Sequence, residues 1–141
     1  MKSYVLMLQT DADDRNITEL ILSDIHLTIP VKFVADIDDF ESFITVEGRP
    51  ALIIISESNK KFKAVEIVKQ LKSNPAYSHI PMVILAEQSP DEYIKESYAA
   101  GASTFITKPS TVELTKKKIE GFFTYWLNIA ELPAETPVET D

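Results

Sequence analysis

The sequence predicts a doubly wound α/β domain in which one five-stranded parallel sheet lies between two layers of helices. Three observations lead to this prediction. Short apolar runs alternate along the chain with longer segments of helical periodicity. The run 52–55 contains a leucine and three isoleucines, as expected for a strand that is buried on both faces of a parallel sheet. The connections between these segments are short, which favours right-handed crossovers through helices.

Length and composition indicate one domain. The chain has 141 residues, 45% of them hydrophobic and 26% charged, as is usual for a globular protein with a single core. It contains no cysteine, which excludes disulfides, thiolate metal sites and a cysteine nucleophile. We expect residues 1–130 to form the domain. Residues 131–141 are acidic and contain two prolines, so we expect a disordered tail.

The charge and the hydropathy of the chain exclude two classes of function. A formal net charge of −8 argues against a surface that binds nucleic acid, which requires clustered lysine and arginine. No apolar run approaches the roughly 20 residues that cross a bilayer, and the N-terminus lacks the pattern of a signal peptide. We therefore expect a cytoplasmic protein that binds neither nucleic acid nor a membrane.

Two helices are expected between the first three strands. The expected strands are 4–8, 31–35 and a run that ends at Ser56. The first helix should bury a face that contains Ile17, Leu20, Ile21 and Ile25, with Asp13 and Asp14 at its start, where carboxylates complement the helix dipole. The second helix should be capped by Asp36 or Asp38, bury Phe40, Phe43 and Ile44, and end at Gly48.

Three helices and two strands complete the predicted domain. A helix over 62–73 should bury Val65, Val68 and Leu71. Strands are expected at 81–86 and 104–107, with a helix over 90–100 between them that Gly101 closes. The last helix should open with the capping box Ser110 to Glu113 and run to about residue 129.

The end of the central strand is the expected position of the functional site. In open α/β sheets, ligands bind beyond the carboxyl ends of the strands. Ser56 occupies that position on the strand predicted to be most deeply buried. Its hydroxyl is un-ionised at neutral pH, and as a nucleophile it would need an adjacent base that the sequence does not place there. We therefore expect no enzyme activity.

Several segments carry a resemblance to a known family. They are the strand 50–56, the run 65–75 followed by 79–85, and Ala100-Gly101-Ala102 leading to 105–109, which ends in Lys108-Pro109. Through them, residues 3 to about 129 resemble the receiver domain of bacterial two-component response regulators. The resemblance implies the CheY-like, flavodoxin-like (βα)5 three-layer sandwich.

The resemblance also implies a phosphorylation pocket and shows how this chain departs from it. Such receivers accept a phosphoryl group from a kinase histidine onto an aspartate at the end of the third strand. An acidic pair after the first strand helps to hold Mg²⁺, a hydroxyl residue ends the fourth strand and a lysine ends the fifth. The matching positions here are Ser56 for the acceptor, Gln9 and Thr10 for the acidic pair, Ala86 for the hydroxyl and Lys108 for the lysine, while Phe105 matches the aromatic residue that reports activation.

Only Lys108 retains the family's residue, so we interpret the chain as a degenerate receiver, or pseudo-receiver, without the acceptor aspartate. Mg²⁺ binding rests on carboxylates and is expected to be lost or weak, with no other metal or cofactor bound. The loop after Ser56 also departs from the family's pattern, at Asn59-Lys60 and Ala64.

Three functional interpretations follow. The first is a stand-alone, phosphorylation-independent interaction module of a two-component pathway, with a sensor histidine kinase or another signalling protein as partner and a homodimer left open. Its expected interaction face contains Tyr98, Phe105, Phe122, Tyr125 and Trp126. The second is an active receiver with its acceptor relocated to Asp11 or Glu57. The third is a flavin- or nucleotide-binding protein, although residues 11–14 place negative charge where a phosphate loop would lie.

Overall fold

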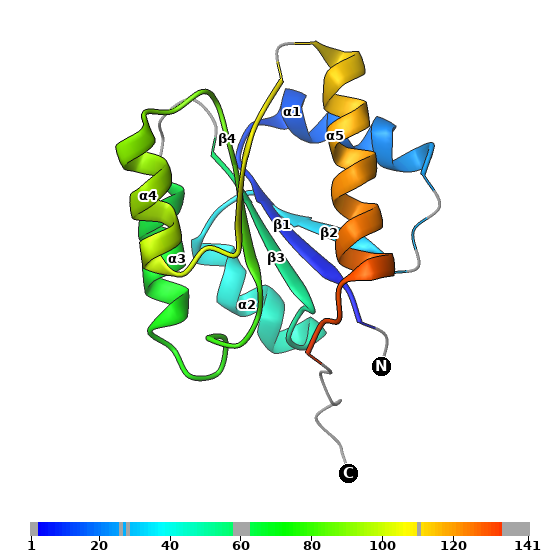
Figure 1. Ribbon diagram of the computed structural model, residues 1–141. Coiled ribbons are helices and arrows are strands. Elements are labelled where there is room, and N and C mark those ends of the chain that lie inside the picture. Colours follow the sequence, from blue (N-terminus) through cyan, green and yellow to red (C-terminus); the bar gives the residue numbers. More distant parts are fainter. Residues whose placement is uncertain (1–2, 26, 28, 58–62, 110, 134–141) are drawn as a thin grey trace.

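The computed structural model describes residues 3–25, 27, 29–57, 63–109 and 111–133. Its strands form one parallel sheet in the order β2-β1-β3-β4-β5, with helices on both faces (Figure 1). The doubly wound fold predicted from the sequence is confirmed. The strands are β1 (Val5–Gln9), β2 (Val31–Val34), β3 (Leu52–Ser56), β4 (Met82–Ala86) and β5 (Thr104–Thr107). The helices are α1 (Ala12–Ser23), α2 (Asp38–Glu47), α3 (Ala64–Lys72), α4 (Asp91–Ala100), α5 (Val112–Thr124) and the π-helical turn η1 (Tyr125–Ile129).

The central strands β1 and β3 bring the site residues together. They pair in parallel from Val5 opposite Leu52 to Gln9 opposite Ser56. Every residue of both strands is buried, as their continuous apolar runs require. The pairing therefore places the side chains of Gln9 and Ser56 next to each other at the carboxyl edge of the sheet.

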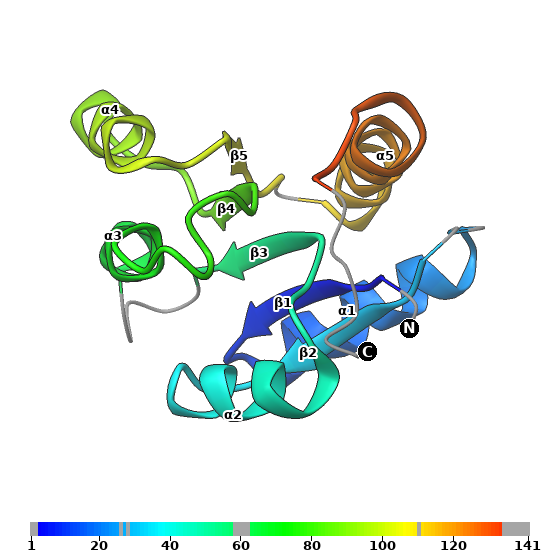
Figure 2. The same cartoon turned by 90° about the horizontal axis from the view of Figure 1, so that it is seen from below.

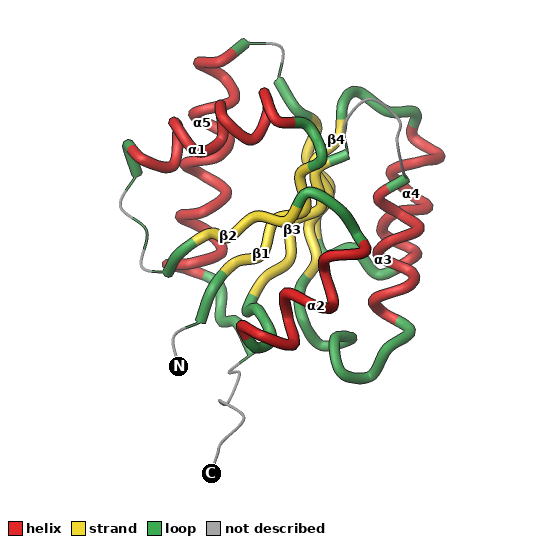
Figure 3. The backbone as a smooth tube through the Cα atoms, turned by 180° about the vertical axis from the view of Figure 1, so that it is seen from behind, coloured by secondary structure: helices red, strands yellow, loops and turns green. Residues whose placement is uncertain are grey.

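The helices form two layers, each with its own hydrophobic cluster. Helices α1 and α5 cover one face, and α2, α3 and α4 cover the other (Figures 2 and 3). On the α1–α5 face, Ile21, Ile119 and Phe123 pack against β1, β3 and β4. On the opposite face, Phe40 and Ile44 of α2 join four α3 residues against the same strands. Both faces of the sheet are thus covered, as a three-layer sandwich requires.

The buried face of α1 differs from the prediction. Ile17 is 37% exposed and Leu20 is 70% exposed, whereas Thr18 and Ile21 are buried. The helix is rotated so that Thr18, rather than Leu20, faces the sheet. The periodicity of the apolar residues alone therefore placed the helix face incorrectly, and it leaves Ile17 at the rim of the fold.

One helix start agrees with the prediction and two differ from it. Asp13 and Asp14 lie in the first turn of α1, as predicted, and Asp11 is the N-cap, whose side chain accepts a hydrogen bond from the Asp14 N–H. Ile37, and not Asp36 or Asp38, is the N-cap of α2. Thr111, and not Ser110, caps α5 by accepting from the Leu114 N–H, while Ser110 itself lies outside the described residues. The predicted helix ends at Gly48 and Gly101 are confirmed, and both glycines have positive φ.

Two further predictions fall on residues that the structure does not describe. Most of the predicted tail, residues 134–141, lies outside the described residues, as do Asn59 and Lys60 of the loop after β3. Within the described part of the chain, no helix combines the length and the apolar character that a membrane crossing requires.

Candidate functional site

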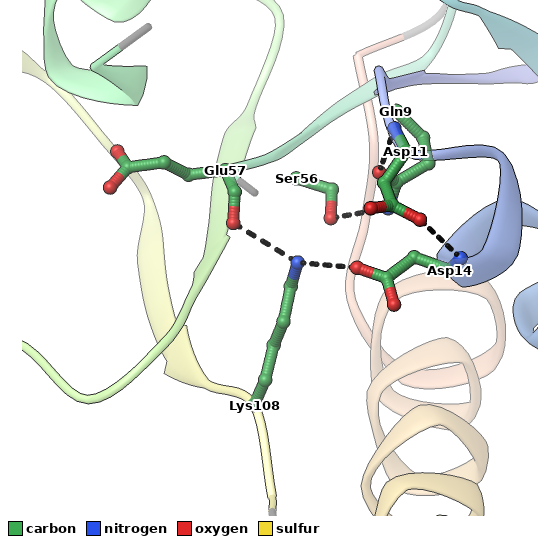
Figure 4. A network of polar contacts seen from close by, with 6 residues as sticks. All are labelled: Gln9, Asp11, Asp14, Ser56, Glu57 and Lys108. Atoms are coloured by element: carbon green, nitrogen blue, oxygen red, sulfur yellow. Dashed lines mark hydrogen bonds and ion pairs between the residues drawn. The ribbon is translucent and has the colours of Figure 1, made fainter. Parts of the chain in front are cut away.

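The centre of the candidate site is a hydrogen bond between two neutral side chains. The Gln9 amide donates from Nε2 to the Ser56 hydroxyl oxygen over 2.6 Å (Figure 4). Gln9 is 2% exposed and Ser56 is fully buried. The Gln9 carbonyl oxygen in turn accepts a hydrogen bond from the Asp11 N–H at 3.0 Å. A buried polar pair of this kind is stable because each group satisfies the other.

Lys108 closes the site from the side of β5. Its ammonium group donates to the Glu57 carbonyl oxygen at 3.1 Å and lies 3.6 Å from a carboxylate oxygen of Asp14 (Figure 4). Its backbone N–H donates to the carbonyl oxygen of Ala86 at 2.8 Å. Lys108 therefore connects the ends of β3, β4 and β5 with the first turn of α1.

Asp14 is the site residue that sequence reasoning missed. The sequence suggested only a helix-start role for it, because acidic residues are common in a first helical turn. The structure instead places its carboxylate at the Lys108 ammonium group. The sequence feature that could have indicated this contact is the position of Asp14, three residues after the cap Asp11, in the first turn of α1.

The other two matched positions, Thr10 and Ala86, are also in place. Ala86 is fully buried at the end of β4 and has no hydroxyl to offer. The Thr10 hydroxyl oxygen is buried and has no hydrogen-bond partner among the described residues. Like Gln9 and Ser56, these two residues carry no charge, and the ion pair between Lys108 and Asp14 brings charges of both signs to this end of the sheet.

The Glu57 side chain points away from Ser56 and Lys108 (Figure 4). Its carboxylate accepts hydrogen bonds from the Ala64 N–H at the start of α3, at 2.8 Å, and from the Tyr93 hydroxyl on α4. Burial raises the pKa of the Tyr93 hydroxyl, and the hydrogen bond to Glu57 raises that pKa further. Glu57 therefore joins the pocket to α4, since its carbonyl oxygen contacts Lys108 and its carboxylate contacts Tyr93.

The predicted aromatic face is divided between the two sides of β5. Phe105 packs edge-on against Tyr93, with ring centroids 5.9 Å apart, and its N–H donates to the Tyr98 hydroxyl at 3.0 Å. Tyr98 itself is 48% exposed. These three residues lie on the α4 side of the edge strand.

The α5 members of the predicted face are in a different environment. Phe122 and Trp126 pack against the hydrophobic cluster beneath α5 and are only partly exposed. Tyr125 is 51% exposed and its ring packs edge-on against Trp126. The exposed aromatic surface is therefore concentrated at Tyr98 and Tyr125, and the remaining rings contribute mainly to the core.

Two carboxylates belong to the polar network at this end of the sheet. The Asp11 carboxylate accepts a hydrogen bond from the Asp14 N–H, and the Asp14 carboxylate is paired with Lys108. Mg²⁺ prefers hard oxygen ligands, usually with one or two carboxylates among them. Among the described residues, no group of three or more histidine, cysteine or acidic side chains could hold a metal.

Comparison with known proteins finds relatives among response regulators. No protein-family model matches the chain. The chain is 25% identical over 141 residues to the response regulator Rcp1 of Synechocystis sp., covering 94% of both proteins. It is 26% identical over 113 residues to a probable chemotaxis protein CheY of Rhizobium etli, covering 79% of this chain and 88% of that protein. The crystal structure of the Mn²⁺-bound form of Rcp1 superposes with a TM-score of 0.82 at 22% identity, covering 94% of this chain and all of the other.

Proposed function

We propose that this chain, which is a receiver domain of the response-regulator type, serves two-component signalling as an interaction module that does not need phosphorylation. The single observation that carries the proposal is the buried hydrogen bond from the Gln9 amide to the Ser56 hydroxyl. Two neutral, mutually satisfied groups occupy the positions at which a working receiver has carboxylates.

The direction of that hydrogen bond opposes nucleophilic activation of Ser56. A serine becomes a nucleophile when a neighbouring base accepts its proton. Here the neighbour is an amide N–H that donates to the serine oxygen, so it cannot remove the proton. A serine hydroxyl also cannot form the acyl phosphate that an aspartate forms. Ser56 is therefore proposed to be a structural residue.

Weak or absent Mg²⁺ binding is part of the same proposal. An ion at the degenerate pocket, formed by Gln9, Thr10, Ser56, Ala86 and Lys108, would have to draw on Asp11 and Asp14. The Asp11 carboxylate caps α1 and the Asp14 carboxylate lies 3.6 Å from the Lys108 ammonium group, so either carboxylate would give up an existing contact. The neutral oxygens of Gln9 and Ser56 do not compensate for the missing carboxylates.

The two relocated acceptors are engaged in other contacts. The Asp11 carboxylate accepts from the Asp14 N–H at 3.0 Å and so caps α1. The Glu57 carboxylate accepts from the Ala64 N–H and the Tyr93 hydroxyl. Phosphorylation of either residue would cost these contacts, so no specific observation favours an active receiver with a displaced acceptor.

The test combines intact-mass measurement with amide NMR. The protein is incubated with Mg²⁺ and acetyl phosphate, and separately titrated with Mg²⁺ and beryllofluoride, which imitates a phosphoryl group on an aspartate. We expect no phosphoryl adduct and no saturable shift at Thr10, Ser56 or Lys108. A receiver with its acidic residues intact, treated in parallel, shows that the reagents work.

An acid-labile adduct, or saturable shifts that spread from Lys108 to Phe105, would overturn the proposal. The variants Asp11→Asn and Glu57→Gln would then identify the acceptor, because the adduct would disappear in one of them and persist in the other. Asp14→Asn would report in the same way on the carboxylate beside Lys108.

A further inference from the structure

A cavity of about 140 Å³ continues from the degenerate pocket into the layer between α1, α5 and the sheet. Its walls are mostly apolar. Met7 and Ile54 line it from the central strands, Ile106 from β5, and Ile119 and Phe122 from α5. The half-exposed Ile17 of α1 also lines it. The cavity therefore combines an apolar body with one end at the site residues Gln9 and Ser56.

The positively charged groups that line this cavity outnumber the negatively charged ones. The charged groups are the ammonium groups of Lys108 and Lys118 and the carboxylate of Asp14. The Lys118 ammonium group donates to the Thr107 carbonyl oxygen at 2.9 Å, which holds it near the carboxyl end of β5. Two positive charges and one negative charge leave a local charge of +1, although the whole chain carries −8. One additional negative charge would make the lining neutral.

The size of the cavity limits the apolar part of a ligand. A cavity of about 150 Å³ lined by leucine, isoleucine and phenylalanine is known to hold a benzene molecule. The present cavity is of similar volume, and its lining combines apolar side chains with the polar residues Gln9, Ser56, Lys108 and Lys118. A single ring or a short branched chain therefore fits the apolar part, and a polar head would lie at the lysine end.

We infer that this cavity is a binding site for a small organic monoanion, a carboxylate whose apolar body is about the size of one aromatic ring. The carboxylate lies at the lysine end, between Lys108 and Lys118, and within reach of the Ser56 hydroxyl. The ring lies against Ile119, Phe122 and Ile17. This inference goes beyond the proposed function, since the site can bind such a ligand whether or not Ser56 and its neighbours take part in phosphoryl chemistry.

Benzoate is the probe for the first test, and benzyl alcohol is its neutral counterpart of similar size. We expect benzoate to give saturable amide shifts at Ser56, Thr107 and Ile119, with a dissociation constant on the order of 1 mM, as is reasonable for so few atoms. Benzyl alcohol should bind at least about threefold more weakly, because it lacks the charge that the two lysines favour.

A pair of lysine variants tests the charged end. Lys118→Gln should weaken benzoate binding about threefold to fivefold, the range expected for one partly exposed ion pair. Lys117→Gln is the matched control, because Lys117 is its exposed neighbour on α5 and does not line the cavity. The control variant should bind benzoate like the unmodified protein.

A pair of tryptophan variants tests the apolar part without disturbing the core. Ile17→Trp places a large ring at the edge of the cavity and should weaken benzoate binding about tenfold or more by occupying the volume. Leu20→Trp puts the same ring on the same helix at a position that is 70% exposed and outside the cavity lining, and should leave binding unchanged.

Three outcomes would overturn the inference. The first is the absence of saturable shifts with benzoate. The second is equal affinity for benzyl alcohol, which would make the cavity an unselective apolar site. The third is equal weakening by the two members of either variant pair, which would place binding elsewhere. None of these outcomes depends on the phosphorylation test, so the two proposals can fail separately.

Discussion

Ser56 is polar and fully buried, and the side chain of Gln9 satisfies its hydroxyl oxygen. Its oxygen accepts the Gln9 amide N–H at 2.6 Å. Ser56→Ala should lower the free energy of unfolding by about 1–3 kcal/mol, because the buried amide is left without this acceptor. Urea denaturation measures the change, with exposed Ser78→Ala as control. A loss no greater than that of the control would mean that the hydrogen bond contributes nothing to stability.

Thr10 presents the opposite case at the adjacent position. Its hydroxyl oxygen is buried and finds no hydrogen-bond partner in the described part of the chain. Thr10→Val keeps the shape of the side chain and removes the unsatisfied group, so the free energy of unfolding should stay the same or rise by up to about 1 kcal/mol. The same urea experiment measures this. A clear destabilisation would show that the hydroxyl has a partner, such as a bound water molecule.

Tyr93 makes the stability sensitive to high pH. Burial and the hydrogen bond to Glu57 raise the pKa of its hydroxyl in the folded protein. In the unfolded chain a tyrosine ionises near pH 10. Above about pH 10 the unfolded state therefore loses a proton that the folded state keeps, and the contribution to stability declines as the pH rises toward the folded pKa.

Tyr93→Phe removes this ionisation, so its free energy of unfolding should fall less steeply above about pH 10 than that of the unmodified protein. Both slopes are measured by denaturant unfolding at a series of pH values that begins about two units below the ordinary tyrosine pKa. Tyr125→Phe, at a ring that is half exposed, is the control variant. Identical slopes for Tyr93→Phe and the unmodified protein would contradict the role of Tyr93.

A glycine follows α4 and another lies inside α5, and replacing them with alanine should change stability in opposite directions. Gly101 ends α4 with φ of +116°, and a Cβ atom there would lie 3.0 Å from the side chain of Lys72. Gly101→Ala should therefore cost about 1–2 kcal/mol. Gly121 lies inside α5 with open space around it, so Gly121→Ala should stabilise the protein by about 0.5–1 kcal/mol. Thermal unfolding compares the two, and changes of the same sign would contradict this account.

The elements also show how far sequence reasoning reaches. Strand β5 was predicted with its observed bounds, and β3 with its observed end, because a run of β-branched and aromatic residues between turn residues has few alternatives. The helix ends at Gly48 and Gly101 followed from glycine's tolerance of positive φ. The face of α1 was predicted incorrectly, because packing of the whole layer decides whether Thr18 or Leu20 faces the sheet.

The sequence predicts which residues lie at the candidate site, but not which of their side chains contact one another. The places of Gln9, Ser56 and Lys108 follow from the order of strands in a parallel sheet. The pairing of Asp14 with Lys108 does not, because a residue in the first turn of a helix can cap the helix or reach across to a strand end. The direction of the Glu57 side chain also depends on a tyrosine 36 residues later in the chain, which local patterns do not reveal.

Across the whole molecule, burial falls from the central strands toward β5. All residues of β1 and β3 are buried, whereas all four residues of β5 are only partly buried. Local opening should therefore occur most readily at β5. Native-state hydrogen exchange should show the slowest amides in β1 and β3 and clearly faster ones in β5. Equal protection in all of these strands would contradict the expectation.

The contacts of the residue that follows β3 restrict insertions and deletions at this point of the chain. Loops usually tolerate inserted residues. Glu57, however, presents its carbonyl oxygen to Lys108 and its carboxylate to Tyr93 and the first turn of α3. One residue inserted between Ser56 and Glu57 would shift both groups at once and disconnect β5 and α4 from the end of β3. During evolution, gain or loss of a residue at this point should therefore be rarer than in an ordinary surface loop.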